Sequence, residues 1–101
     1  MPSAILCGND VLAWGALHAL ARTGVRVPEE VSVTGIGDFK GSRELEPALT
    51  TVRIPAQKIG MKGAQMILAS ITGSETDPPN ALLAPELKVR ATCHAVRGPL
   101  R

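Results

Sequence analysis

The stretch that decides the fold is Ser3–Gly24, SAILCGNDVLAWGALHALARTG. Ser3–Cys7 is a short apolar run that predicts a buried β-strand. From Val11 onward the apolar residues recur at helical spacing, and Gly24 predicts a left-handed end to that helix. A strand that leads through a tight polar turn into a helix is the unit from which parallel α/β sheets are built.

The turn between this strand and this helix carries two polar side chains, Asn9 and Asp10. Either of them can cap the helix by accepting hydrogen bonds from its free N–H groups. The helix needs only one such cap, so the other side chain is free to bind a ligand. Open α/β sheets bind their ligands at the carboxyl ends of the strands. The sequence therefore predicts a binding site beside this turn.

The rest of the chain repeats the alternation of strands and helices. The expected elements are strands at Val31–Ile36 and Leu49–Ile54, a helix from Pro55 to about Thr72, and a final strand or broken pair at Leu82–Leu83 and Leu87–Thr92. Because a helix joins the first two strands, a right-handed crossover makes them parallel neighbours. The fold class is therefore α/β, with a mostly parallel sheet and flanking helices. A loop at 37–41 is expected at the same carboxyl edge as Asn9.

The composition limits the classes of function to be considered. A chain of 101 residues is long enough for one small domain. Its net charge of +2 is too small to indicate that this segment binds nucleic acid. The sequence shows neither an apolar run of about 18 residues, which a membrane span needs, nor the pattern of a secretory signal. The two cysteines lie far apart, and reduced thiols in a cytoplasmic protein are expected.

Neither catalysis nor metal or cofactor binding is expected. His18 lies about two helical turns beyond the carboxyl edge, whereas Cys7 ends a buried strand, so the two cannot act as nucleophile and base. Gly35 and Gly37 begin a dinucleotide-binding pattern, but Lys40 stands where its third glycine belongs. No group of residues has the spacing of zinc ligands. The sequence therefore predicts no catalytic residue, no metal ligand and no cofactor.

Three blocks of the sequence resemble the last third of LacI/GalR-family transcriptional regulators. They are CGNDVLAWGALHALARTGVRVPEEVSVTGIGD, PALTTVRIPAQKIGMKGAQMIL and PELKVRAT, and they stand in the family's order. The resemblance covers roughly residues 2 to 92. It implies an incomplete fold like that of the periplasmic sugar-binding proteins. Residues 1–101 would be the C-terminal segment of the effector-binding and dimerisation domain, with 93–101 as a disordered tail. The DNA-binding domain and the first lobe would be absent.

By position, the resemblance also assigns effector contacts. Asn9 matches the family's effector-contacting asparagine, and Asp10 beside it is expected to be the helix cap. Gly37 stands where the family has an acid that hydrogen-bonds the hydroxyls of the effector, and Ile54 stands at or near the place of a polar residue. Asp38 follows Gly37 as a third candidate contact, with turn formation as its alternative role. We expect the missing acid to favour an acidic effector, unless Asp38 takes its place and restores binding of a neutral sugar.

Trp14 and Leu45 match positions of the family's dimer interface. The alternative for Trp14 is a place at the edge of the core, because it lies between two apolar stripes of its helix. The expected function is therefore that of the effector-sensing and dimerisation part of a cytoplasmic repressor. Its partners would be a sugar or sugar acid, a second copy of the protein, and operator DNA through the missing N-terminal domain. A periplasmic sugar-binding protein and a doubly wound enzyme are the alternatives.

Overall fold

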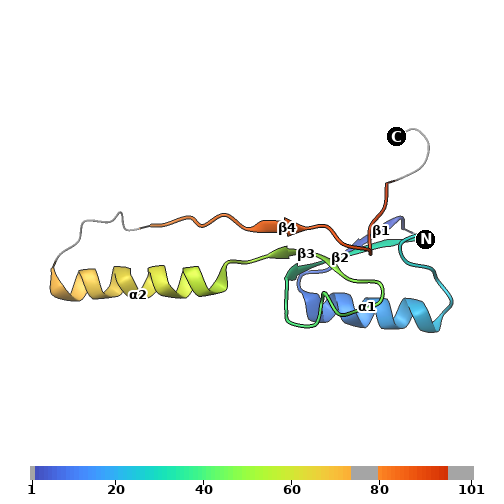
Figure 1. The fold of residues 1–101 in the computed structure, drawn as a ribbon, viewed down its shortest axis with the longest axis horizontal. Helices are drawn as coiled ribbons and strands as arrows, with labels where there is room; N and C mark the ends of the chain where they lie inside the picture. The colour runs from blue at the N-terminus through green and yellow to red at the C-terminus, as the bar shows by residue number, and fades with distance from the viewer. Residues whose placement is uncertain (1, 74–79, 96–101) are drawn as a thin grey trace. The chain divides into compact units, whose positions relative to one another are not determined.

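The computed structural model of the chain describes residues 2–73 and 80–95. In chain order these residues form β1 (Ala4–Leu6), α1 (Asp10–Arg22), β2 (Ser32–Gly37), β3 (Thr50–Arg53), α2 (Ala56–Thr72) and β4 (Glu86–Lys88) (Figure 1). The chain divides into two units. The larger one contains β1, α1, β2, β3 and the segment from Leu87 onward, and the smaller one is Ile54–Glu86.

The strands form one sheet in the order β1-β2-β3-β4. β1 pairs in parallel with β2, with Ile5 opposite Val33. β2 pairs in parallel with β3 as far as Gly37, which lies opposite Arg53. The predicted parallel α/β arrangement is therefore confirmed. Because all three strands run the same way, the residues that follow them lie at one edge of the sheet.

The core of the larger unit lies between α1 and the sheet (Figure 1). Its fully buried members are Ala13 of α1, Val33 of β2 and Leu49, which comes just before β3. Gly35 lets the two layers approach closely. A β-carbon at this residue would lie 3.2 Å from the Cα atom of Asp10 and 3.2 Å from a methyl group of Leu49. A larger residue here would therefore push the start of α1 away from β2.

Both helices end as the sequence predicts. Gly24 follows α1 with φ of +76°, and the next N–H, that of Val25, donates to the carbonyl of Leu20 at 2.9 Å. Gly73 closes α2 with φ of +73°. Both glycines adopt the left-handed conformation that other residues rarely take, which is why glycine ends so many helices.

One prediction about burial is wrong. β1 is not a buried strand, because it lies at the edge of the sheet and Leu6 leaves 79% of its surface exposed. No residue of α2 is buried, although Ile59, Ile67 and Ile71 repeat at helical spacing. An apolar stripe indicates which face a helix buries, but burial itself needs a partner surface. The apolar face of α2 is therefore exposed in this chain.

The final strand is shorter than predicted. β4 covers only Glu86–Lys88, and Leu82–Leu83 lies outside it. Beyond β4, side-chain hydroxyls replace part of the ladder: Thr92 donates to the carbonyl of Val33 at 2.6 Å and accepts from the N–H of Thr50 at 2.9 Å. Within the expected tail at 93–101, the N–H of His94 donates to the Ser32 hydroxyl. Residues 96–101 lie outside the described residues.

Candidate functional site

Four residues that end or follow the parallel strands lie at the carboxyl edge of the sheet. Asn9 follows β1, Gly37 and Asp38 end and follow β2, and Arg53 ends β3. We call this group the rim. The sequence predicted the first three of these residues, and it missed Arg53.

Asn9, not Asp10, caps α1. The Oδ1 atom of Asn9 accepts a hydrogen bond from the N–H of Leu12 at 2.9 Å, and its backbone is extended, as a cap requires. The prediction that Asp10 is the cap is therefore wrong. Asn9 still has a polar group for a ligand, since no described residue accepts a hydrogen bond from its Nδ2 atom.

Asp10 instead turns inward and is completely buried. Its Oδ2 atom accepts from the N–H of Phe39 at 2.7 Å and from the hydroxyl of Ser42 at 2.6 Å. Its Oδ1 atom accepts from the hydroxyl of Thr51 at 2.6 Å. A buried carboxylate is tolerated when donors surround it in this way. Asp10 thereby joins the start of α1 to the loop between β2 and β3, and to β3 itself.

Asp38 is held by two arginines. The Nε and Nη2 atoms of Arg53 both lie 2.7 Å from Oδ2, and the Nη2 atom of Arg90 lies 2.8 Å from Oδ1. Burial by itself raises the pKa of the Asp38 carboxyl, but hydrogen bonds and charge from Arg90 and Arg53 outweigh burial and hold the pKa below its ordinary value. Asp38 is therefore ionised at neutral pH.

Asp38 and the two arginines together carry one net positive charge. The side chain of Asp38 is only 3% exposed, whereas that of Arg53 is 41% exposed. Arg90 also donates through Nη1 to the carbonyl of Leu49 at 2.9 Å, and its side chain is 13% exposed. The group that faces solvent here is therefore Arg53. Its position at the end of β3 was the one sequence signal that could have identified it.

The space beside Gly37 is filled. Gly37 has φ of +125°, and a β-carbon built on it would collide with the ring of Phe39. From the sequence, Asp38 could have taken the place of the acid that is missing at residue 37. Instead the ring of Phe39 lies beside Gly37, and both carboxylate oxygens of Asp38 are paired with arginines.

The two predicted dimer residues lie together. Trp14 and Leu45 line a cavity of about 360 Å³, whose other lining residues are Leu17, His18, Ala21, Val25, Val27, Glu46 and Pro47. Trp14 also contacts the interior of the unit. Its Nε1–H donates to the Ser42 hydroxyl at 3.1 Å, and its ring meets the ring of Phe39 edge to face, with centroids 6.2 Å apart. Trp14 thus reaches from the cavity to the loop after β2.

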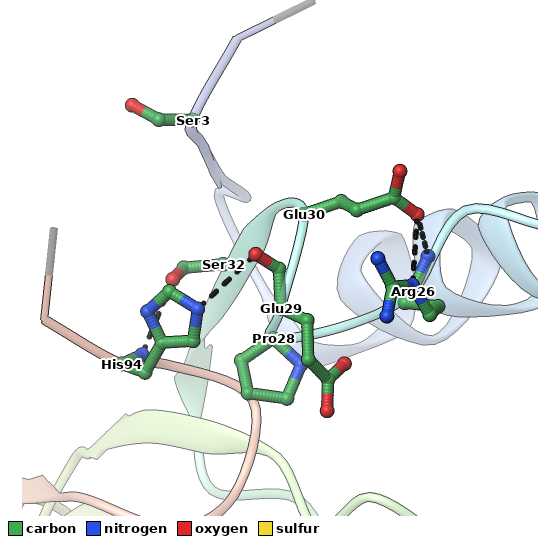
Figure 2. A pocket seen from close by; sticks show the side chains of 7 residues that line it. All are labelled: Ser3, Arg26, Pro28, Glu29, Glu30, Ser32 and His94. Carbon is green, nitrogen blue, oxygen red and sulfur yellow. Dashed lines mark hydrogen bonds and ion pairs between the residues drawn. The ribbon is translucent and has the colours of Figure 1, made fainter. Parts of the chain in front are cut away.

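A second cavity, of about 510 Å³, lies at the opposite ends of the strands. Figure 2 shows its lining residues, which are Ser3, Arg26, Pro28, Glu29, Glu30, Ser32 and His94. The backbone N–H of Arg26, followed by its charge, lowers the pKa of Glu30. His94 Nε2 lies 3.2 Å from the carbonyl of Glu29. Ser3 and Ser32 stand at the amino ends of β1 and β2, so this cavity is separate from the rim.

The described part of the chain offers little for other kinds of site. Within residues 2–73 and 80–95, no three side chains of the metal-binding types come together in a way that would hold a metal ion. None of the helices in these ranges is both long and apolar enough to cross a membrane. Burial raises the pKa of the Cys7 thiol, which makes it a poorer nucleophile.

The geometry agrees with the chain's likeness to known proteins. A family model for the periplasmic binding protein-like domain matches residues 1–93. The probable transcriptional repressor ExuR of Bacillus subtilis is 40% identical over 89 residues, which are 88% of this chain and 27% of that protein. The repressor PurR of Yersinia enterocolitica is 35% identical over 100 residues, which are 99% of this chain and 29% of that protein.

Solved structures give the same result. The structure of the lac repressor dimer bound to operator and the anti-inducer ONPF matches with a TM-score of 0.85 at 33% identity, over 93% of this chain and 32% of that one. The chain thus spans about a quarter to a third of the length of these relatives. The chain belongs to the periplasmic binding protein-like domain family, and within it to the LacI-type regulators, of whose effector-binding domain it forms a part.

Proposed function

We propose that this chain is the C-terminal segment of the effector-binding and dimerisation domain of a cytoplasmic LacI-type repressor. The observation that carries the proposal is the match of residues 1–93 to the periplasmic binding protein-like domain family, with a polar rim at the carboxyl edge of the sheet. In the whole regulator, a separate N-terminal domain contacts operator DNA. The chain itself contributes no catalytic step.

The effector that best fits the rim is a sugar acid. Arg53 offers a half-exposed positive charge to a carboxylate, and Asp38 holds that guanidinium in place through two bonds to one oxygen. Asn9 donates to a sugar hydroxyl through Nδ2, while its Oδ1 remains on the helix. Because residue 37 is glycine, no carboxylate stands there to repel an anionic effector at short range. Asp38 therefore acts on the effector by orienting Arg53.

Dimerisation uses the cavity lined by Trp14 and Leu45. Both residues are half-buried and belong to segments far apart in the sequence, and the cavity between them is mostly apolar in its lining. Aromatic residues of this kind are enriched at protein interfaces. The lac repressor structure that the chain resembles is a dimer. A second copy of the protein is therefore the proposed occupant of this surface.

The mechanism is a shift between two states. An effector that binds between the two lobes changes the balance between open and closed domains only if its affinities for the two differ. That difference is transmitted through the dimer to the spacing of the paired DNA-binding domains. Effector binding and operator binding are then linked, each changing the affinity for the other by the same factor.

The test uses the whole regulator and the DNA that flanks its own gene. Fluorescence anisotropy measures the affinity for labelled fragments of this DNA, with and without sodium gluconate or glucose. We expect specific binding whose affinity gluconate changes, and we expect Asn9→Ala to remove this response without changing binding in the absence of sugar. Sugar binding without any specific DNA binding would contradict the proposal and favour a periplasmic sugar-binding protein.

A further inference from the structure

Three donors from separate segments converge on one buried carboxylate. The N–H of Phe39 and the hydroxyl of Ser42 both donate to Oδ2 of Asp10, and the hydroxyl of Thr51 donates to Oδ1. Asp10, Ser42 and Thr51 are all completely buried. None of these residues belongs to the rim, and the sequence predicted no functional part for Ser42 or Thr51.

The Oδ2 atom of Asp10 lies between the rim and the dimer surface. On one side it holds Phe39, whose backbone follows Gly37 and Asp38 directly and whose ring fills the space beside Gly37. On the other side it holds Ser42, whose hydroxyl oxygen accepts from the indole N–H of Trp14. A continuous chain of hydrogen bonds thus connects the loop at the rim to a residue that lines the Trp14–Leu45 cavity.

We propose that Asp10 and Ser42 are positioning residues that couple occupancy of the rim to the conformation of the dimer surface. The inference rests on the proposed function, because it takes the rim as the effector site and Trp14 as a dimer contact. A ligand that displaces Phe39 removes a donor from Oδ2 of Asp10. Asp10 then no longer holds the Ser42 hydroxyl in one position, and the Trp14 indole, whose N–H donates to that hydroxyl, moves.

Because Asp10 and Ser42 are buried, we expect the hydrogen bonds between them to have two distinct arrangements. With water excluded, a donor or acceptor that loses its partner is costly, so the group settles in one of two satisfied arrangements. Coupling between sites requires an element of this kind, with two states that both sites can bias. The edge-to-face contact between the rings of Phe39 and Trp14 gives the same two segments a second connection.

Thr51 supplies a matched control for Ser42. Each residue is completely buried, and each donates a hydroxyl to Asp10 at 2.6 Å. Thr51 binds the other carboxylate oxygen and does not contact Trp14 through a hydrogen bond. Thr51 also contacts the rim, because its hydroxyl oxygen accepts a hydrogen bond from the backbone N–H of Asp38 at 3.4 Å. Ser42→Ala and Thr51→Val therefore remove similar bonds, but only the first breaks the connection to Trp14.

The first experiment uses the 101-residue chain, in which Trp14 is the only tryptophan. Asp38→Asn perturbs the rim, and the ¹H–¹⁵N resonance of the Trp14 indole reports the response. We expect Asp38→Asn to shift this resonance in the otherwise unchanged chain and in Thr51→Val, but not in Ser42→Ala. A shift that persists in Ser42→Ala, or disappears equally in both variants, would overturn the proposal.

The second experiment uses the whole regulator and sodium gluconate. Sedimentation gives the dimer dissociation constant with and without gluconate; we expect a change of about tenfold, within the usual range of coupling between sites. The change should remain in Thr51→Val and fall to within about twofold in Ser42→Ala.

Trp14→Phe removes the hydrogen bond to Ser42 without altering the buried hydroxyl, so this variant replaces Ser42→Ala if Ser42→Ala does not fold. An equal response in all variants would overturn the coupling. Failure of every variant, wild type included, to bind gluconate contradicts the proposed effector instead, and the indole shift then decides the coupling.

Discussion

Arg53 binds a single oxygen of Asp38, Oδ2, through two nitrogens, since Nε and Nη2 each lie 2.7 Å from this oxygen. The arginine side chain is 41% exposed and the aspartate side chain only 3% exposed, so a ligand at the rim meets the guanidinium first. This relationship favours an indirect role for Asp38 over the direct effector contact that the sequence predicts. Asp38 fixes the position of the Arg53 guanidinium.

Replacing Asn9 or Asp10 by alanine should lower the free energy of unfolding by unequal amounts. Asn9→Ala removes a helix cap and should lower the free energy of unfolding by about 1 kcal/mol. Asp10→Ala leaves three donors without their acceptor, two of them hydroxyls of buried residues, and should lower it by at least about 3 kcal/mol. Urea unfolding followed by Trp14 fluorescence, at one protein concentration, measures both. A larger loss for Asn9→Ala than for Asp10→Ala would contradict the role of Asp10 as the acceptor that joins α1 to β3 and the loop before it.

Stability should fall in acid because of Asp38. Its pKa is lower in the folded chain than the ordinary value near 4. The paired carboxylate therefore contributes its full stabilisation above about pH 4, and this contribution is lost as the pH falls through the lowered pKa. Thermal unfolding at pH 7, 5, 4 and 3 measures the trend.

Asp38→Asn is the control for this acid effect. The variant cannot form the same charged pairs with Arg53 and Arg90, so it should be less stable at pH 7. The difference between wild type and variant should then narrow below about pH 4. A difference that stays constant from pH 7 to pH 3 would show that the ion pairs contribute nothing.

Restoring an acid at residue 37 should destabilise this chain. Gly37→Asp places a β-carbon against the ring of Phe39 and forces a side chain into a backbone conformation with φ of +125°. We expect a loss of about 2 kcal/mol or more in the free energy of unfolding. Phe39→Ala in the same chain should recover part of it, because the collision disappears while the backbone strain remains. Strict additivity of the two changes would contradict the contact.

Charge placed at the Trp14–Leu45 cavity should weaken the dimer of the whole regulator. Trp14→Asp and Leu45→Asp come from different segments that line the same cavity, and each should raise the dimer dissociation constant at least about tenfold. Leu12→Asp on the same helix is the control, because Leu12 is 59% exposed and lies outside the cavity. Sedimentation that shows unchanged dimers for both cavity variants would return Trp14 to the core-edge role.

The fold was largely predictable because its signals are local. The turn before α1, the β-branched run of β2 and the glycines that end both helices each act within a few residues. The β1–β2 pairing followed from the handedness of the crossover. The exposure of β1 and α2 was not predictable, because burial depends on surfaces that lie elsewhere in the family's domain.

The site was predictable only in part, for a related physical reason. Asn9 and Asp10 are equivalent as caps in the sequence, and only the distant donors from Phe39, Ser42 and Thr51 decide which one turns inward. Partners 29 to 41 residues away leave no local pattern. The role of Arg53 likewise depends on the neighbouring strand, where Asp38 follows Gly37, the last paired residue.

Isothermal titration calorimetry with gluconate and glucose on the whole regulator shows whether Arg53 binds the carboxylate of an acidic effector. Gluconate carries a carboxylate at C1 and is an open chain, whereas glucose is mostly a ring, so Arg53→Gln is needed to isolate the effect of the carboxylate. We predict that gluconate binds more tightly than glucose, and that Arg53→Gln removes this preference while Asn9→Ala weakens gluconate binding. Tighter binding of glucose, weakened by Asp38→Ala and unaffected by Arg53→Gln, would contradict this prediction.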